Sequence, residues 1–314
     1  MARPDIRDRL AAGTPLVLDG AMGSELQRRG VWVSHGATES KLGAWSATAM
    51  RDAPETVRAI HEDYFRAGAD IATTNSFWTN SVKLGLVGLG DKAAEYTRRS
   101  GEIAVETRDR LRPQAHVAGG MAPPRGGRAP VDPIDLPREF ALQSRALKEG
   151  GVDVLLVEYI GYVDDIVAAL DAVKPAGLPV MIGLRHITED GAMQAGESFD
   201  QLVTALGARE VAAILLMCSS PTAISAGLPK LRNAFSGPIG AYPNTGYRRA
   251  DKPLGPSQQW HGLDTTTYTP AHLAADGATW LGMGAQIIGG CCATTPEHIA
   301  ALRAVVPQSR SPAT

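Results

Sequence analysis

Three common features of folded and exported proteins are scarce or absent in this sequence. Its 314 residues include only three cysteines, an odd number that cannot form a complete set of disulfides. No apolar run approaches the roughly 18 residues of a membrane-spanning helix, and the charged N-terminal segment lacks the apolar core of a signal peptide. These absences predict a cytoplasmic protein, in whose reducing surroundings a few cysteines bind metals or react rather than crosslink the chain.

An excess of charge of one sign is also missing. Lys and Arg number 31, Asp and Glu number 33, and the net charge is −2, so no basic surface predicts binding to nucleic acid or to a membrane. Aromatic residues make up only 5% of the chain, whereas apolar residues make up 44% and can fill a large core. No segment marks a subunit interface, and the oligomeric state stays open.

Short apolar segments alternate with amphipathic ones along the whole chain. Several apolar segments are continuous runs, as in parallel strands that are covered on both faces. The predicted strands are residues 16–21, 69–77, 116–122, 152–160, 178–186, 211–220, 238–244 and 285–292. The clearest helical patterns are residues 53–68, 91–112, 136–151, 163–175, 198–207, 221–235, 270–284 and 295–306.

This alternation predicts a single (β/α)8 TIM barrel of the α/β class. The alternative is an open doubly wound sheet, but no G-x-G-x-x-G follows the first strand. The barrel domain is expected over residues 1–306, followed by a flexible polar tail, residues 307–314. Two loops rich in proline and glycine, residues 123–135 and 245–268, would lie at the C-terminal face, where barrel enzymes place their active sites.

All three cysteines fall at predicted strand ends on that face. Cys218 closes the sixth strand, and Cys291 and Cys292 close the eighth. These strands lie roughly 10 Å apart by ordinary strand spacing, so thiolates that lean inward could converge. Three thiolates match the ligands of a tetrahedral Zn²⁺, one per chain, with its fourth position open. Gly289 and Gly290 would let the strand leave its regular pleat, so that both thiols of the pair turn to one point.

A site of three soft sulfur ligands suits a thiol better than water as its fourth ligand. Three thiolates make zinc a weak Lewis acid, whereas binding of a thiol lowers its pKa and produces the nucleophilic thiolate. The pattern therefore predicts alkylation of a substrate thiol. The alternatives are buried inert cysteines, or a non-catalytic zinc or dithiol protein in which Cys291 and Cys292 respond to redox state.

Several segments resemble the zinc-dependent homocysteine S-methyltransferases. They are "LDGAMGSEL" (18–26), "AGADIATTNSF" (67–77), "LLMCSSP" (215–221), "YPNTG" (242–246) and "GGCCATTPEHI" (289–299). The resemblance implies a (β/α)8 barrel in which Cys218, Cys291 and Cys292 hold the zinc. It also implies a homocysteine site, where Glu158 binds the amino group and Asp19 with Gly20 helps to hold the amino acid.

The resemblance defines the methyl donor less closely. A chain of 314 residues has no room for cobalamin- and folate-binding domains, which favours a small onium donor of the betaine or S-methylmethionine type. Such cations bind to aromatic faces. Trp45, Trp78 and Tyr159 lie in segments that resemble the betaine-dependent enzymes, whereas Asn244 lies in "YPNTG", which favours the S-methylmethionine branch. All four residues are expected at the donor site.

Two positions depart from the usual pattern of the family. Met217 precedes Cys218 where the family usually has Asn, and Ala293 follows Cys292 where Gly is usual. Neither departure removes a metal ligand. They leave open a different thiol acceptor, or a sulfonium donor such as S-adenosylmethionine or dimethylsulfoniopropionate. His186 closes the fifth predicted strand, and the sequence assigns it no role.

Overall fold

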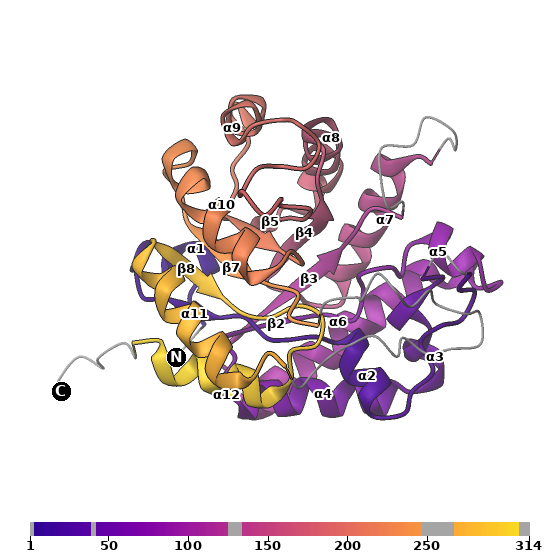
Figure 1. Ribbon diagram of the computed structural model, residues 1–314. Coiled ribbons are helices and arrows are strands. Elements are labelled where there is room, and N and C mark those ends of the chain that lie inside the picture. Colours follow the sequence, from indigo (N-terminus) through magenta and orange to yellow (C-terminus); the bar gives the residue numbers. More distant parts are fainter. Residues whose placement is uncertain (1–2, 39–41, 125–133, 247–266, 308–314) are drawn as a thin grey trace.

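Eight parallel strands form one closed barrel. The computed structural model describes residues 3–38, 42–124, 134–246 and 267–307. The strands follow the order β1-β8-β7-β6-β5-β4-β3-β2, and a parallel bridge between Leu18 and Ile71 joins the two ends of this sheet. Figure 1 shows the helices arranged around the strands. The predicted (β/α)8 barrel is confirmed, and the open doubly wound sheet was the wrong alternative.

Each predicted strand contains one observed strand, which is shorter than predicted or of nearly the same length. The strands are β1 (Leu16–Val17), β2 (Ile71–Thr73), β3 (His116–Met121), β4 (Val154–Ile160), β5 (Val180–Leu184), β6 (Ala213–Met217), β7 (Ile239–Tyr242) and β8 (Ala285–Ile288). The difference that bears on the site concerns β8, which ends at Ile288, so that Cys291 and Cys292 lie in the turn after the strand. The chain leaves the hydrogen-bond pattern of the sheet at this point. The N–H of Gly290 donates to the carbonyl of Asp19, and the N–H of Cys291 donates to the carbonyl of Pro243.

The eight predicted helices are also present. They are α4 (Pro54–Arg66), α6 (Ala93–Leu111), α7 (Leu136–Glu149), α8 (Val163–Val173), α9 (Phe199–Leu206), α10 (Pro221–Ala234), α11 (Pro270–Gly282) and α12 (Pro296–Val305). Four further helices were not predicted: α1 (Ile6–Ala11), α2 (Gly23–Arg28), α3 (Ala49–Asp52) and α5 (Ser81–Gly85). These helices have six residues or fewer, and such short segments show no helical period.

The inside of the barrel is filled by side chains. Alternate strand residues such as Leu156 and Leu215 form one buried cluster with Ile6 and Leu10 of α1, which covers the N-terminal end of the barrel. Met217 belongs to the same cluster at the opposite end. Because the interior is packed, a substrate can enter only at the C-terminal ends of the strands.

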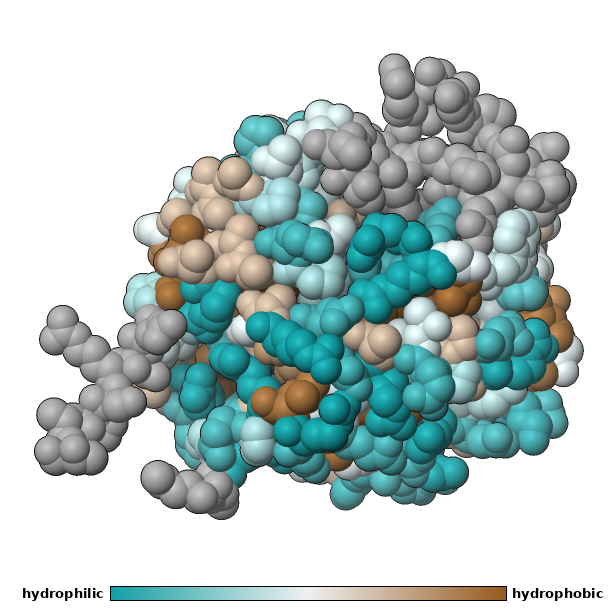
Figure 2. All heavy atoms as spheres, turned by 90° about the horizontal axis from the view of Figure 1, so that it is seen from below, coloured by the Kyte–Doolittle hydropathy of each residue, from teal (hydrophilic) through white to brown (hydrophobic). Residues whose placement is uncertain are grey.

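One face of the molecule is largely polar. On the face in Figure 2, hydrophilic residues predominate and hydrophobic ones are scattered among them. No helix in the described part of the chain is long and apolar enough to cross a membrane. Most of the two predicted loops (residues 125–133 and 247–266) and of the tail (residues 308–314) lies outside the described residues.

A buried carboxylate stabilises the N-terminal end of the barrel. Asp70 accepts the N–H of Val17 at 3.0 Å, and its two oxygen atoms pair with Arg112 at 2.8 Å and with Arg303 at 2.7 Å. These contacts join β1, the segment before β2, the end of α6 and α12. The Asp70→Ala substitution would leave two guanidinium groups unpaired, so we expect it to lower the free energy of unfolding by about 3 kcal/mol, measured by urea denaturation.

The control for this prediction is an exposed ion pair on the helices. Asp171 pairs with Arg209 at 2.7 Å, and both side chains are about one third to one half exposed. Because solvent screens such a pair, Asp171→Ala should change the free energy of unfolding by less than about 1 kcal/mol. Equal effects of the two substitutions would contradict a special role of Asp70.

Candidate metal centre

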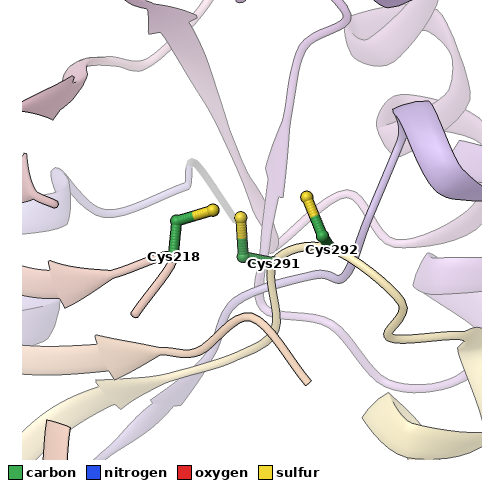
Figure 3. Close-up of side chains that lie close together, drawn as sticks. All are labelled: Cys218, Cys291 and Cys292. Carbon is green, nitrogen blue, oxygen red and sulfur yellow. The ribbon is translucent and has the colours of Figure 1, made fainter. Parts of the chain in front are cut away.

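The three cysteines come together at the C-terminal end of the barrel. Cys218 follows β6 directly, and Cys291 and Cys292 lie in the turn after β8. Their sulfur atoms all lie within 4.8 Å of one another. Figure 3 shows the three side chains, which come from two separate segments and direct their sulfur atoms toward a shared space. All three side chains are half-buried.

This arrangement fits a metal ion. A tetrahedral zinc with bonds of ~2.3 Å to sulfur places its sulfur ligands about 3.8 Å apart, so small side-chain rotations would suffice here. Hydrogen bonds from Cys218 and Cys291 lower the pKa of the Cys292 thiol well below its ordinary value, whereas those from Cys218 and Cys292 raise the pKa of Cys291. The metal-free cluster therefore favours one thiolate, and a bound cation would favour three.

The two glycines before the cysteine pair have a different role from the one predicted. Neither has a positive φ, so the turn does not depend on their conformational freedom. A Cβ atom on Gly289 would lie 2.6 Å from the Cβ of Leu18, and one on Gly290 would lie 2.2 Å from the Oγ1 of Thr294. Gly289 and Gly290 thus allow close approach to β1 and to the segment before α12, and this packing places the cysteine pair beside the mouth.

Strained backbone collects around the same site. Among the described residues other than glycine, the five with positive φ are Trp45, Tyr159, His186, Cys218 and Ala293. The first four line the cavity described below, and the fifth follows Cys292. Left-handed conformations cost non-glycine residues free energy, and they persist where the surrounding structure holds them, often at functional sites.

Ala293 gives a direct test of this strain. Its φ is 67°, and its N–H donates to the Oγ of Ser24 at 3.0 Å. Glycine adopts this conformation freely, so Ala293→Gly should raise the free energy of unfolding of the metal-free protein by roughly 0.5–1 kcal/mol. The matched control is Ala275→Gly on the exposed side of α11, which should lower that free energy by about 1 kcal/mol. A loss of stability in both variants would contradict strain at Ala293.

A cavity of about 210 Å³ opens beside the cysteines at the barrel mouth. Every residue that the sequence analysis assigned to a site lines it. They are Asp19, Gly20, Trp45, Trp78, Glu158, Tyr159, Cys218, Asn244, Cys291 and Cys292. The cavity is also lined by residues that were not predicted at the site, among them Asn75, Phe77, His186, Met217 and Tyr242.

Two buried carboxylates face this cavity. The Asp19 carboxylate accepts the N–H of Thr73 at 2.8 Å, and the Glu158 carboxylate accepts the hydroxyl of Tyr242 at 3.2 Å. Burial raises the pKa of each carboxyl group to about 8. Neither carboxylate forms an ion pair with a Lys, Arg or His side chain in the described part of the chain, so a bound ammonium group would favour their charged forms. Gly120 makes room for Glu158, because a Cβ there would lie 2.5 Å from Oε1.

Aromatic rings form the wall next to Glu158. The ring of Phe77 lies 5.1 Å from that of Trp78 and 5.3 Å from that of Tyr159, measured between centroids. Two cations of the protein cover one face each: Lys83 lies 3.7 Å from the centroid of Trp78, and Arg185 lies 4.1 Å from that of Tyr159. A ligand in the cavity can therefore use only the remaining faces and edges of these two rings.

Trp45 and Asn244 contribute from two other segments. Trp45 packs on Gly23, where a Cβ would lie 2.2 Å from the indole nitrogen, so only glycine leaves room for the ring. The side chain of Asn244 accepts the N–H of Gly246 at 3.2 Å. Asn244 thus orders the loop after β7 in addition to lining the cavity.

Met217 links the aromatic wall to the carboxylates. Its thioether sulfur accepts the N–H of Tyr159 at 2.9 Å and lies 3.2 Å from the hydroxyl of Tyr242, which also contacts Glu158. The inward position of Met217 follows from the strand alternation with Leu215. The place of Met217 directly before Cys218 was a signal for the site, but β6 is a continuous apolar run, so the sequence did not show which of its side chains point inward.

The fold and this cavity define a class of protein. It is a TIM-barrel enzyme in which three cysteines that could hold a metal ion lie beside two buried carboxylates at the barrel mouth. The chain belongs to the homocysteine S-methyltransferase family, whose model matches residues 16–306. It is therefore a methyltransferase, and its family membership supports methyl transfer to homocysteine.

Individual relatives agree with this assignment. The chain is 28% identical over 311 residues to homocysteine S-methyltransferase YbgG of Bacillus subtilis (strain 168), over 90% of this chain and 92% of that protein. It is 27% identical over 348 residues to a selenocysteine methyltransferase of Astragalus bisulcatus, over 99% and 98% of the two chains. The oxidized form of the homocysteine methyltransferase MmuM from Escherichia coli is a similar solved structure, with a TM-score of 0.78, 25% identity and coverage of 96% and 99%.

Proposed function

We propose that this protein transfers a methyl group from a small onium donor to the thiol of homocysteine and so forms methionine, with one Zn²⁺ held by Cys218, Cys291 and Cys292. The observation that carries the proposal is the position of three sulfur atoms within 4.8 Å of one another, in a cavity that Asp19 and Glu158 also line. A zinc ion bound there would lower the pKa of the substrate thiol, so that the thiolate predominates at neutral pH.

The two carboxylates would orient the acceptor. In this proposal Glu158 accepts hydrogen bonds from the homocysteine ammonium group, and Asp19 with the backbone of Gly20 holds the rest of the amino acid. Charge-assisted hydrogen bonds of this kind are stronger than neutral ones, particularly in a buried site. Burial raises the pKa of both carboxyl groups to about 8, so their charged forms are unfavourable in the empty site. A bound ammonium group would offset this desolvation cost.

The transfer itself is a single displacement. The thiol loses its proton to solvent, and the thiolate sulfur forms a bond to the methyl carbon of the donor. The bond between that carbon and the onium atom breaks at the same time, and its electron pair stays with the departing donor. Trp45, Trp78, Tyr159 and Asn244 would hold the donor in line with the sulfur, and this alignment supplies much of the rate enhancement.

A second candidate keeps this chemistry and changes the acceptor. Met217 lies inside the cavity and presents a thioether, which offers no hydrogen-bond donor to a substrate. Another thiol or a selenol is then a candidate acceptor, and one relative of the chain is named a selenocysteine methyltransferase. A non-catalytic dithiol protein is the remaining alternative from another class, and it requires no methyl transfer at all.

A donor screen tests the proposal. Zinc-loaded protein is incubated with homocysteine and with S-methylmethionine, glycine betaine, S-adenosylmethionine or dimethylsulfoniopropionate, and methionine is measured. Methionine formation with at least one donor, and about one zinc per chain in reduced protein, are expected. A reduced protein that binds no zinc would overturn the proposed zinc site. Bound zinc without methyl transfer to homocysteine, or to another thiol or a selenol tested in its place, would favour the dithiol alternative.

A further inference from the structure

His186 is a cavity residue with no established role. It follows β5 directly after Arg185, and its side chain is exposed at the mouth. Its ring packs against the ring of Tyr159 in an edge-on arrangement with centroids 6.0 Å apart. Within the described part of the chain, neither ring nitrogen forms a hydrogen bond, so both can face a ligand.

The backbone holds this residue in a strained conformation. The φ of His186 is 56°, in the left-handed region that histidine seldom adopts. Its carbonyl accepts the N–H of Gln194 at 2.9 Å, and the next N–H, that of Ile187, donates to the Oγ of Ser219 at 2.9 Å. These anchors on both sides keep the ring at the mouth, and the strain indicates a position that serves more than packing.

Within the described residues, the cavity lining lacks a cationic partner for an anion. Its charged lining residues in the described part of the chain are Asp19 and Glu158, and no Lys or Arg lines it there. Glycine betaine, S-methylmethionine and dimethylsulfoniopropionate all carry a carboxylate a few carbon atoms from the onium atom. Partial desolvation and the charge of Arg185 lower the pKa of His186 to about 4, so the exposed ring is neutral at pH 7 and keeps an N–H donor.

We propose that His186 determines donor specificity by donating a hydrogen bond to the carboxylate of the methyl donor. The inference rests on the proposed function, because it assumes an onium donor in the same cavity. The contact with Tyr159 assigns His186 to the donor rather than to homocysteine, since an onium group against the aromatic wall places its nearby carboxylate beside the imidazole. Arg185, on the face of Tyr159, adds positive potential on the same side.

The test compares donors with and without a carboxylate. The His186→Ala variant is assayed with the carboxylate donor that the wild-type protein uses best in the screen, and with trimethylsulfonium, which has no carboxylate. We expect KM for the carboxylate donor to rise about 10-fold, as for the loss of one hydrogen bond to a charged group. KM for trimethylsulfonium, KM for homocysteine and the zinc content should each change less than about two-fold.

Two further variants complete the design. His186→Asn keeps an N–H donor near the position of the imidazole and should recover part of the donor affinity. His272→Ala removes an exposed histidine that does not line the cavity. The variant loses a contact with Thr269 at the start of α11 and some stability with it, but its KM values should match those of the wild-type protein. Calorimetric titration of donor into zinc-loaded protein without homocysteine gives the same comparison, and no turnover occurs because the acceptor is absent.

Each other outcome has a defined meaning. An equal rise of KM for trimethylsulfonium would show that His186 acts on the onium group or on the shape of the mouth, and would overturn the proposal. A rise of KM for homocysteine alone would show that His186 binds the acceptor and would overturn the proposal. Unchanged KM values for all substrates would show that His186 has no part in donor binding. If the wild-type protein transfers no methyl group from any donor, the proposed function fails first, and the role of His186 fails with it.

Discussion

Replacement of Cys218 by serine is expected to abolish methyl transfer and to leave little bound zinc. In the proposed site Cys218, directly after β6, is one of three sulfur ligands, and the turn after β8 supplies the other two. A neutral hydroxyl is a poor substitute for a thiolate in a soft site. Loss of an outer-shell contact already reduces metal affinity about 10- to 100-fold, so loss of a ligand should exceed 100-fold. Zinc affinity is measured by competition with a chelator, and activity by methionine formation.

The control is Ser220→Ala, two residues further along the chain. The hydroxyl of Ser220 accepts the N–H of Ala223 at the start of α10, so its loss should cost about 1 kcal/mol of stability. Zinc content and activity should remain. Full zinc content in Cys218→Ser would contradict the three-cysteine site. Zinc loss in both variants would show that the segment, rather than the thiol, is required.

The Glu158→Gln variant is expected to raise KM for homocysteine about 100-fold while zinc stays bound. Glutamine keeps the shape of the side chain but removes the charge that we propose binds the substrate ammonium. A hydrogen bond between two charged groups in a buried site is worth up to about 3 kcal/mol, which corresponds to about 100-fold in affinity. Steady-state kinetics with homocysteine as the varied substrate measure the effect.

The same substitution should stabilise the substrate-free protein at alkaline pH. Burial raises the pKa of Glu158 to about 8, above its value in the unfolded chain. The stability associated with the neutral carboxyl group is therefore present at low pH and lost as the pH rises through about 8. Glutamine stays neutral, so Glu158→Gln should unfold at higher urea concentration than the wild-type protein at pH 9. A loss of stability there would indicate a structural role for Glu158.

Glu139 offers a matched control for Glu158. Its buried carboxylate accepts the N–H of Ser81 at 2.7 Å and the hydroxyl of the same residue at 2.5 Å, and Glu139 does not line the cavity. Glu139→Gln should lower the free energy of unfolding by roughly 1–2 kcal/mol and leave KM for homocysteine unchanged. Opposite effects of the two substitutions on stability and on KM would distinguish a binding carboxylate from a structural one.

The positions of helices and strands were largely predictable because their signals are local. A strand covered on both faces, such as β4, leaves a continuous apolar run, and an amphipathic helix such as α4 leaves a period of 3.6 residues. The end of β8 was not predictable in this way. Residues 289–292, Gly-Gly-Cys-Cys, carry no charge or polar side chain that would mark the end of the strand, yet the backbone turns there. The hydrogen bond from Gly290 to Asp19 that ends the ladder joins residues far apart in the chain.

The candidate site was predictable in part for a related reason. Parallel strands of a barrel end on one face, so Cys218 and Glu158 could be assigned to the same mouth from their places in the sequence. Phe77 and Tyr242 were present in the quoted segments, but which ring turns inward depends on packing between neighbouring strands. His186 has no sequence signal beyond its place at a strand end, and its exposure at the mouth became visible only in the structure.

The sequence by itself therefore determined the (β/α)8 architecture, the three cysteines and the chemical character of the site, because periodicity and side-chain chemistry are local properties. Only the tertiary structure decided that the sulfur atoms lie within 4.8 Å of one another, that Gly289 and Gly290 serve close packing, and that Ala293 adopts the left-handed conformation. These properties depend on closure of the barrel, which brings β1 against β8 and β2, and no local pattern records such distances.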